Sequence, residues 1–215
     1  MPDFWFKEFD ATSYLPQNWQ SSILKVAENE AKFKVLTASS VTSRELTTHV
    51  RIPVFTVGAQ VVSSQLPWLL DIYKGKFRDI AQTLTSEVVS VADDLRYAVN
   101  LNIQRGIDMR YECHVDSNPI EGLLYVTDHP EGSGGELIVA KNKNARGEEA
   151  IALDATRIFP KAGKLVFFDG RIHPHFVASL MGPLDMRVVV AMNFYLPSCP
   201  ESSRPADLNH HLGIE

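Results

Sequence analysis

Short runs of β-forming residues, separated by turn sequences, fill residues 97–195 and constrain the fold more than any other feature. In the run from Tyr97 to Gln104, apolar residues alternate with asparagines, which is the period-two pattern of a half-buried strand. Because no helical pattern is recognised between the runs, we expect a β-sandwich or barrel. The other runs lie at residues 111–116, 122–127, 136–140, 164–168 and 187–195.

The first 96 residues have a different texture. An amphipathic helix is predicted roughly from Asn18 to Phe33, and a second follows Pro67, where apolar residues recur at helical spacing as far as Ile80. Between these helices, residues 51–57 read as a strand, and Pro53 places that strand at an edge or at its own start.

These patterns predict one α+β domain spanning residues 1–215. We expect a mainly helical buttress at 1–96, a β-core at 97–196 and a tail at 197–215. The tail is rich in Pro and Ser, and we consider it both as a lid over the site and as a disordered terminus.

Composition excludes several classes of protein. The chain has 215 residues and 45% hydrophobic residues, enough for one sizeable core. Its net charge is -5 and its 21 Lys and Arg are scattered, so nucleic acid is not an expected partner. The longest apolar runs are far shorter than the roughly 20 residues that cross a bilayer. The start does not resemble a signal peptide and the two cysteines suit a reducing compartment, so we expect a cytoplasmic protein.

The first motif with chemical meaning is His114-Val115-Asp116. Residues at i and i+2 on a strand point to the same side, so this imidazole and carboxylate could bind one metal ion. A His-x-acid pair is expected about once by chance in such a chain. A second one, His129-Pro130-Glu131, is present in a turn-like segment, so the motif alone is weak.

A second segment strengthens the metal hypothesis. The apolar run 164–168 leads to His173 and His175, and Arg187 then opens another apolar strand. Two imidazoles and one carboxylate are the facial ligand set of non-haem Fe(II), which leaves open positions for a bidentate co-substrate and O2. An arginine that enters the interior needs an anionic partner. A dicarboxylate that spans iron and arginine would satisfy both.

Residues from about 100 to 195 resemble the 2-oxoglutarate/Fe(II)-dependent oxygenases with a double-stranded β-helix, a jelly-roll or cupin-like core. The order of several motifs is more specific than any one of them. The matched elements are Tyr111 before His114-Val115-Asp116, residues 124–128 followed by 134–137, residues 163–168, His175-Phe176-Val177, and Arg187 twelve residues later.

The resemblance implies Fe(II) bound by His114, Asp116 and His175, with 2-oxoglutarate and O2 as co-substrates. It also implies that the distal carboxylate of 2-oxoglutarate pairs with Arg187. His173 competes for the third ligand position, but the family's spacing to the arginine favours His175.

Arg105 departs from the family pattern, because many relatives carry a tyrosine there that helps to hold the co-substrate. We therefore consider Arg105, and Asn102 or Gln104 on the same strand, as auxiliary co-substrate contacts. Alternatively, Asn102 and Gln104 have no role in binding and are only polar residues at the edge of a strand.

A closer resemblance is to a bacterial subgroup that acts on free amino acids and includes a radical halogenase of lysine. It rests on two stretches, residues 114–125 and 188–202. Halogenases of that subgroup have Gly or Ala where the metal-binding carboxylate would stand. Here that residue is Asp116, so the resemblance implies hydroxylation of a free amino acid such as lysine.

Substrate contacts are predicted on the metal rim. The ammonium and carboxylate of an amino acid need an acceptor and a donor there, and the candidates are Tyr111, Ser117, Asn118 and Asn193, with Arg105 as a second choice for the carboxylate. Each could instead pack or stabilise a turn. The alternatives kept open are a halogenase or desaturase on the same iron site, a peptidyl hydroxylase, and a non-enzymatic metal-binding cupin. A homodimer is also left open.

Overall fold

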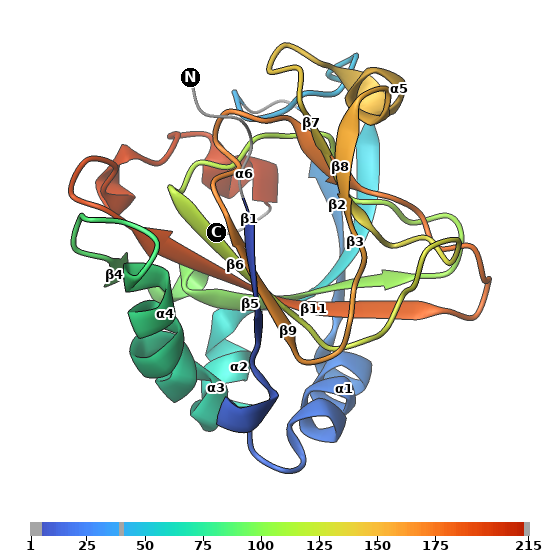
Figure 1. The fold of residues 1–215 in the computed structure, drawn as a ribbon. Helices are drawn as coiled ribbons and strands as arrows, with labels where there is room; N and C mark the ends of the chain where they lie inside the picture. The colour runs from blue at the N-terminus through green and yellow to red at the C-terminus, as the bar shows by residue number, and fades with distance from the viewer. Residues whose placement is uncertain (1–5, 39–40, 213–215) are drawn as a thin grey trace.

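Strand β11 (Met186–Tyr195) lies inside the larger of two antiparallel sheets in the computed structural model, which describes residues 6–38 and 41–212. The strand order of this sheet is β1-β9-β6-β11-β5-β3-β2, and the short β4 also pairs with β11. The smaller sheet has the order β10-β7-β8. Figure 1 shows the smaller sheet above the larger one and helices α1 to α4 below it.

The bounds of the remaining elements follow. The strands are β1 (Phe6–Asp10), β2 (Lys32–Thr37), β3 (Arg51–Val57), β4 (Ser90–Val91), β5 (Val99–Arg105), β6 (Ile120–Tyr125), β7 (Leu137–Ala140), β8 (Ala155–Ile158), β9 (Lys164–Phe168) and β10 (His175–Val177). The α-helices are α1 (Trp19–Glu30), α2 (Ala59–Gln65), α3 (Pro67–Ile72), α4 (Arg78–Gln82), α5 (Gly147–Ala152) and α6 (Leu208–Leu212). A π-helical turn, Tyr73–Phe77, joins α3 to α4, and short 3-10 turns lie at Thr12–Tyr14, Leu95–Tyr97 and Glu201–Ser203.

The larger sheet separates two cores by strict alternation of side chains. On β11, Val188, Val190 and Met192 pack with the helices, whereas Val189 packs in a second cluster between the sheets. The helix-side cluster also takes apolar residues from β5, β6 and β9. The opposite face is free to carry polar residues, and this face bears the site.

The predicted strands at 164–168, 187–195, 122–127 and 136–140 are confirmed, with bounds that shift by up to two residues. The strand at 51–57 is confirmed as well, and β5 pairs with it only from Phe55 to Val57, so Pro53 has a strand neighbour on the β2 side alone. Pro53 therefore costs no hydrogen bond to β5.

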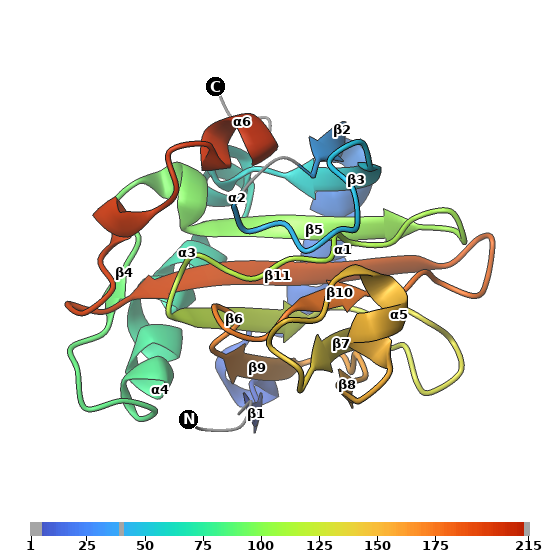
Figure 2. The same ribbon diagram turned by 90° about the horizontal axis from the view of Figure 1, so that it is seen from above.

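The prediction was wrong at three places. The first helix ends at Glu30, and residues 32–37 form strand β2 instead. Strand β1 was not predicted, and together with β2 and the predicted β3 it joins the larger sheet (Figure 2). Residues 111–116 are extended but make only isolated bridges, and helix α5 interrupts the run of strands. For β1 and β2, pairing with β9 and β3 overrides the local pattern.

Two sequence predictions extend beyond the described residues. The absence of a signal peptide concerns a segment of which residues 1–5 are not described, and the predicted tail includes residues 213–215, which also lie outside. Within the described ranges, no helix combines the length and the apolar character needed to cross a membrane.

Candidate metal centre and pocket

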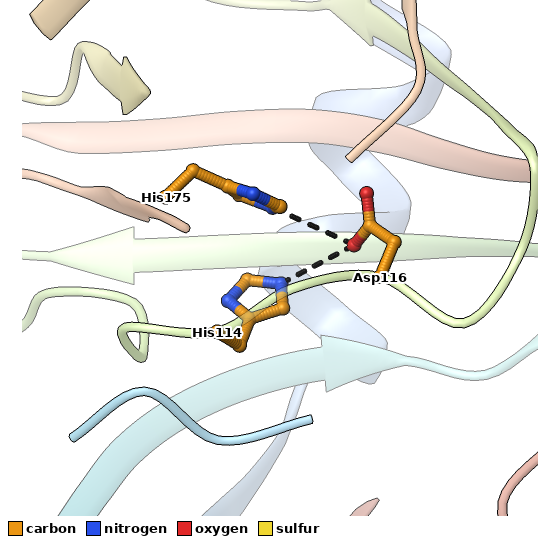
Figure 3. A group of neighbouring side chains, drawn as sticks. All are labelled: His114, Asp116 and His175. Atoms are coloured by element: carbon orange, nitrogen blue, oxygen red, sulfur yellow. Dashed lines mark ion pairs between the residues drawn. The ribbon is translucent and has the colours of Figure 1, made fainter. Parts of the chain in front are cut away.

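His114, Asp116 and His175 converge on one point at the face of the larger sheet that is turned away from helices α1 to α4 (Figure 3). Asp116 Oδ1 lies 3.4 Å from His114 Nε2 and 3.5 Å from His175 Nε2. One ligand atom from each residue lies within 4.8 Å of the others. These three donors could hold one metal ion. His173, the competing ligand, is not part of the group.

Both imidazoles are oriented by backbone carbonyls. His114 Nδ1 lies 2.7 Å from the carbonyl oxygen of Glu112, and His175 Nδ1 lies 3.0 Å from that of His173. When each Nδ1–H donates to its carbonyl, each Nε2 is left to face Asp116: it carries the proton when the imidazole is charged, and it presents a lone pair to a metal ion when that proton is lost. This carbonyl-oriented tautomer is the usual one for histidines that bind metals.

Asp116 has an acceptor oxygen with no partner. Its Oδ2 is buried and makes no hydrogen bond to the described residues. Burial by itself opposes ionisation, but the charge and hydrogen bonds of the two imidazoles outweigh it and hold the pKa of Asp116 well below its usual range. The same partnership raises the pKa of His114 against the effect of burial. A divalent cation would supply the positive charge that this cluster attracts, so the residues fit a metal ion.

Gly170 leaves room for the carboxylate. A Cβ atom at this position would lie 1.9 Å from Asp116 Oδ2 and 2.8 Å from His175 Cε1. The carbonyl of Gly170 also accepts a hydrogen bond from the backbone N–H of Asp116, at 3.0 Å. Only a residue without a side chain can approach the group so closely.

The segment that carries His114 is held from both sides. Backbone bonds of 2.9 Å run in both directions between His114 and His175, and on the other side the N–H of Arg44 donates to Cys113. The buried carboxylate of Glu45 accepts the N–H of Cys113 at 2.8 Å and two bonds from Arg110 at 2.8 and 3.0 Å. The loop at residues 42–45 thus takes the place of a neighbouring strand.

Arg187 is a buried cation that faces the same pocket. Its side chain lies on β11, only 2% of its surface is exposed, and its Nε has no hydrogen-bond partner. Within the described residues, no carboxylate lies within ion-pair distance of it. Burial lowers its pKa, and Tyr125 offsets this only in part; its guanidinium carbon lies 5.5 Å from the Tyr125 ring centroid. A buried guanidinium without an anion is costly unless a ligand supplies one.

The pocket brings together most of the predicted contacts. Asn102, Tyr111, Ser117, Asn118 and Asn193 all line it, together with the metal-ligand group and Arg187. Their surroundings differ, because Asn193 already donates to the carbonyl of Tyr97 and Asn118 is itself buried.

Three predicted residues lie elsewhere. The side chain of Arg105 points away from the pocket: it donates to the carbonyl of Ala27 at 3.3 Å and lies over the ring of Phe55. Gln104 donates to the carbonyls of Met109 and Ala178. His173 Nδ1 lies 2.8 Å from the carbonyl oxygen of Ala140. Arg105 has the same parity on β5 as Leu101 and Ile103, which pack on the helix side of the sheet, and at the exposed end of the strand its bond to Ala27 sets the direction of its side chain.

Sequence reasoning missed several lining residues: Tyr97, Asn100, Glu121, Arg204 and Leu208. A signal was available for two of them. Asn100 belongs to the same alternation as Asn102, and Glu121 is the one charged residue in the otherwise apolar strand β6. Arg204 and Leu208 come from the C-terminal tail, so part of the tail forms a wall of the pocket.

The region that carries the site also matches a known protein family. A family model described as "2OG-Fe(II) oxygenase superfamily" matches residues 97–195. No curated protein matches the chain at a significant level.

Many solved structures share the fold. A 2OG-Fe(II) oxygenase-family oxidoreductase from Burkholderia pseudomallei has a TM-score of 0.60 at 10% identity, covering 88% of this chain and 84% of that one. EctD from S. alaskensis, solved with 2-oxoglutarate and 5-hydroxyectoine, has a TM-score of 0.58 at 11% identity and coverages of 90% and 73%. A prolyl hydroxylase from Trichoplax adhaerens, solved with a peptide of hypoxia inducible factor, has a TM-score of 0.54 at 14% identity and coverages of 90% and 84%.

These likenesses show that the two packed antiparallel sheets have the jelly-roll arrangement of those oxygenases. The matched residues 97–195 contain His114, Asp116, His175 and Arg187. Residues 97–195, the core that carries the site, thus match the 2OG-Fe(II) oxygenase superfamily, a family that uses Fe(II), 2-oxoglutarate and O2, and the fold is shared with such oxygenases across nearly the whole chain.

Proposed function

We propose that this enzyme hydroxylates an unactivated C–H bond of a small substrate, a free amino acid such as lysine or a similar one, and releases succinate and CO2. His114, Asp116 and His175 would hold Fe(II), and Arg187 would pair with the distal carboxylate of 2-oxoglutarate. Iron bound there with 2-oxoglutarate and O2 would supply an oxidant that transfers one oxygen atom to the substrate and the other to succinate. The proposal includes a cytoplasmic location, which suits the two free cysteines.

One observation carries the proposal: a buried arginine that has no carboxylate partner among the described residues faces the same pocket as three convergent metal-binding donors. Each half needs something that the protein does not supply. A group of two imidazoles and one carboxylate favours a cation, and the buried Arg187 favours an anion. A metal ion and a dicarboxylate in the same pocket would satisfy both, because a planar guanidinium matches a carboxylate in two hydrogen bonds.

The chain's own residues would then position the reactants. The carbonyls of Glu112 and His173 hold the two imidazoles in the ligating tautomer. Gly170 admits the carboxylate of Asp116, and Val177 and Val189 give the pocket that Arg187 faces part of its apolar lining. Such a site requires no strong general base, since its task is to orient one C–H bond near the metal.

Two features support hydroxylation of a small molecule over the other reactions of such sites. A carboxylate at position 116 occupies the coordination position that a halogenase leaves for chloride. Residues of the C-terminal tail, Arg204 and Leu208, line the pocket, whereas a peptidyl hydroxylase would need an open groove. The amino-acid specificity rests on the sequence resemblance in residues 114–125 and 188–202.

The experiment is anaerobic addition of 2-oxoglutarate to the Fe(II)-loaded protein. We expect a visible metal-to-ligand charge-transfer absorption band, followed on exposure to O2 by succinate release that a panel of free amino acids stimulates. Mass measurement of the product should show a gain of one oxygen atom. A protein that binds Fe(II) but gives neither the band nor succinate would contradict the proposal and favour a non-enzymatic cupin.

A further inference from the structure

Glu121 is a buried carboxylate that faces the pocket from the strand next to Arg187. It lies on β6, where Ile120 and Leu124 pack on the helix side of the sheet, so Glu121 points to the opposite face. It pairs in register with Asn193 on β11. Only 8% of its surface is exposed. A charged residue at such a position is rare without a partner.

The partner that Glu121 has in the protein is neutral. Asn118 Nδ2 donates to Glu121 Oε2 at 3.0 Å, and the same amide donates to the carbonyl of Ile120 at 2.9 Å. Throughout residues 6–38 and 41–212, no Lys, Arg or His nitrogen forms an ion pair with this carboxylate. The Asn118 amide and the backbone N–H of Met192 are both neutral donors, and they do not compensate for the burial of a carboxylate.

The charged groups around the pocket do not fill this role. Arg204, at the pocket wall, donates from Nη1 to Glu201 Oε1 at 2.5 Å, and its guanidinium carbon lies 3.5 Å from the Tyr97 ring centroid. Arg187 also lines the pocket but does not pair with Glu121. The nearby Asp116 has the same charge as Glu121. Burial and the charge of Asp116 raise the pKa of Glu121 well above its usual value, because both disfavour the ionised carboxylate.

We propose, on the basis of the function proposed above, that Glu121 with Asn118 forms the subsite for a protonated amine of the substrate. The same reasoning applies as for Arg187, with the charges reversed. Glu121 is a buried carboxylate without a cationic partner, and Arg187 is a buried cation without a carboxylate partner. Because both face the pocket, they favour ligand groups of opposite charge. The subsite thus selects substrates that carry an ammonium group and rejects isosteres in which that nitrogen is neutral.

The test measures succinate release by the Fe(II)-loaded protein with 2-oxoglutarate. The panel contains the common L-amino acids, their N-α-acetyl derivatives, and L-norleucine as the partner of L-lysine that lacks the ε-ammonium. Every strong stimulator should carry a free ammonium group. Neutralising the ammonium group that Glu121 binds should lower kcat/KM at least 30-fold. A neutral compound as the best stimulator, or no response to any ammonium compound, would overturn the inference.

Two variants sharpen the test. Glu121→Gln keeps the shape of the side chain and should raise KM for the best amine at least 30-fold, while the charge-transfer band and KM for 2-oxoglutarate stay unchanged. Glu149→Gln removes an exposed carboxylate on α5 and should change none of these values. An unchanged KM for the amine in Glu121→Gln would refute the subsite. If Glu121→Gln does not fold, the panel with the unaltered protein still decides.

The two proposals fail in different ways. Without the charge-transfer band in the unaltered protein, the proposed function itself is wrong. If the band forms and succinate is released, but compounds without any ammonium group serve as well as the free amines, only the amine subsite is wrong.

Discussion

The pocket has two walls that are built by different means. One wall is the larger sheet, where β5, β6 and β11 present Asn102, Glu121 and Arg187 by simple alternation along paired strands. The other wall is the extended segment at residues 111–118 with β10, which presents the metal-binding donors. The sheet wall is held by long ladders, whereas the second wall is held by the short ladder between β10 and β7, by isolated bridges and by hydrogen bonds of Glu45.

The two walls differ in what fixes the positions of their side chains. On the sheet wall, the position of a side chain follows from its place in the strand, because neighbours in the ladder fix the backbone. On the second wall, His114 depends on contacts with residues 42–45, far away in sequence, and on the carboxylate of Glu45. The predictions below test this contrast.

The largest effect is expected on the second wall from Asp116→Gly. This variant removes the carboxylate ligand, so amino-acid-stimulated hydroxylation should fall to background. Product mass measured with and without chloride would show whether the vacated position admits a halide. Asp108→Gly, in an exposed turn, is the matched control and should keep full activity. Full hydroxylase activity in Asp116→Gly would refute the ligand assignment.

On the sheet wall, Arg187→Met should raise KM for 2-oxoglutarate on the order of 100-fold, because loss of a buried charge pair costs about 2–5 kcal/mol. The same variant should stabilise the protein without ligands by about 1–3 kcal/mol, since it removes an unpaired buried cation. Calorimetric unfolding and kinetic titration would measure both effects. Arg105→Met, at the margin of the same sheet, is the control and should leave KM for 2-oxoglutarate unchanged. A destabilised Arg187→Met with unaltered KM would show that Arg187 is structural.

Gly170→Ala should weaken Fe(II) binding by about 10–100-fold, the usual cost of disturbing a residue that supports a metal ligand. The reason is steric, because the new methyl group would collide with Asp116 Oδ2. Titration of the protein with Fe(II) under anaerobic conditions gives the affinity. Gly132→Ala is a useful comparison, since nothing lies within 4 Å of its added Cβ, although its positive φ brings some backbone strain. Equal Fe(II) affinity in Gly170→Ala would mean that the second wall adjusts more freely than the contacts suggest.

The smallest effect is expected from Glu45→Gln, which should lower the free energy of unfolding by about 1–3 kcal/mol. Burial alone would raise the pKa of Glu45, but its bonds to Arg110 and Cys113 outweigh burial and lower the pKa below its ordinary value of 4.5. The stabilising contribution of the ionised carboxylate is therefore fully present above about pH 4.5 and is lost as the pH falls through the lower, folded-state pKa.

The measurement is urea unfolding of both proteins between pH 3 and pH 7. The difference in stability should stay constant above about pH 4.5 and shrink at lower pH. A difference that does not depend on pH would show that the charge of Glu45 contributes nothing to the second wall.

Local patterns predicted much of the sheet wall. The apolar and polar alternation of β5 and β11 placed Asn102 and Arg187 on the inner face, and the strand at residues 164–168 has the bounds that its pattern indicates. The strands β1 and β2 were missed, because their pairing with distant strands outweighs a weak local signal. Glu121 was overlooked although its charge is unusual in an apolar strand.

The sequence by itself determined the types of donor, their order and their spacing: a His-x-Asp pair, a later histidine and an arginine twelve residues beyond it. Only the tertiary structure decided which side chains meet. It turned His173 to the carbonyl of Ala140 and Arg105 to that of Ala27, and it brought Arg204 and Leu208 to the pocket. The physical reason is the distance in sequence between the residues that interact. Alternation along a strand is set by neighbouring residues, whereas the direction of a side chain in a loop or at a sheet margin is set by hydrogen bonds to distant segments.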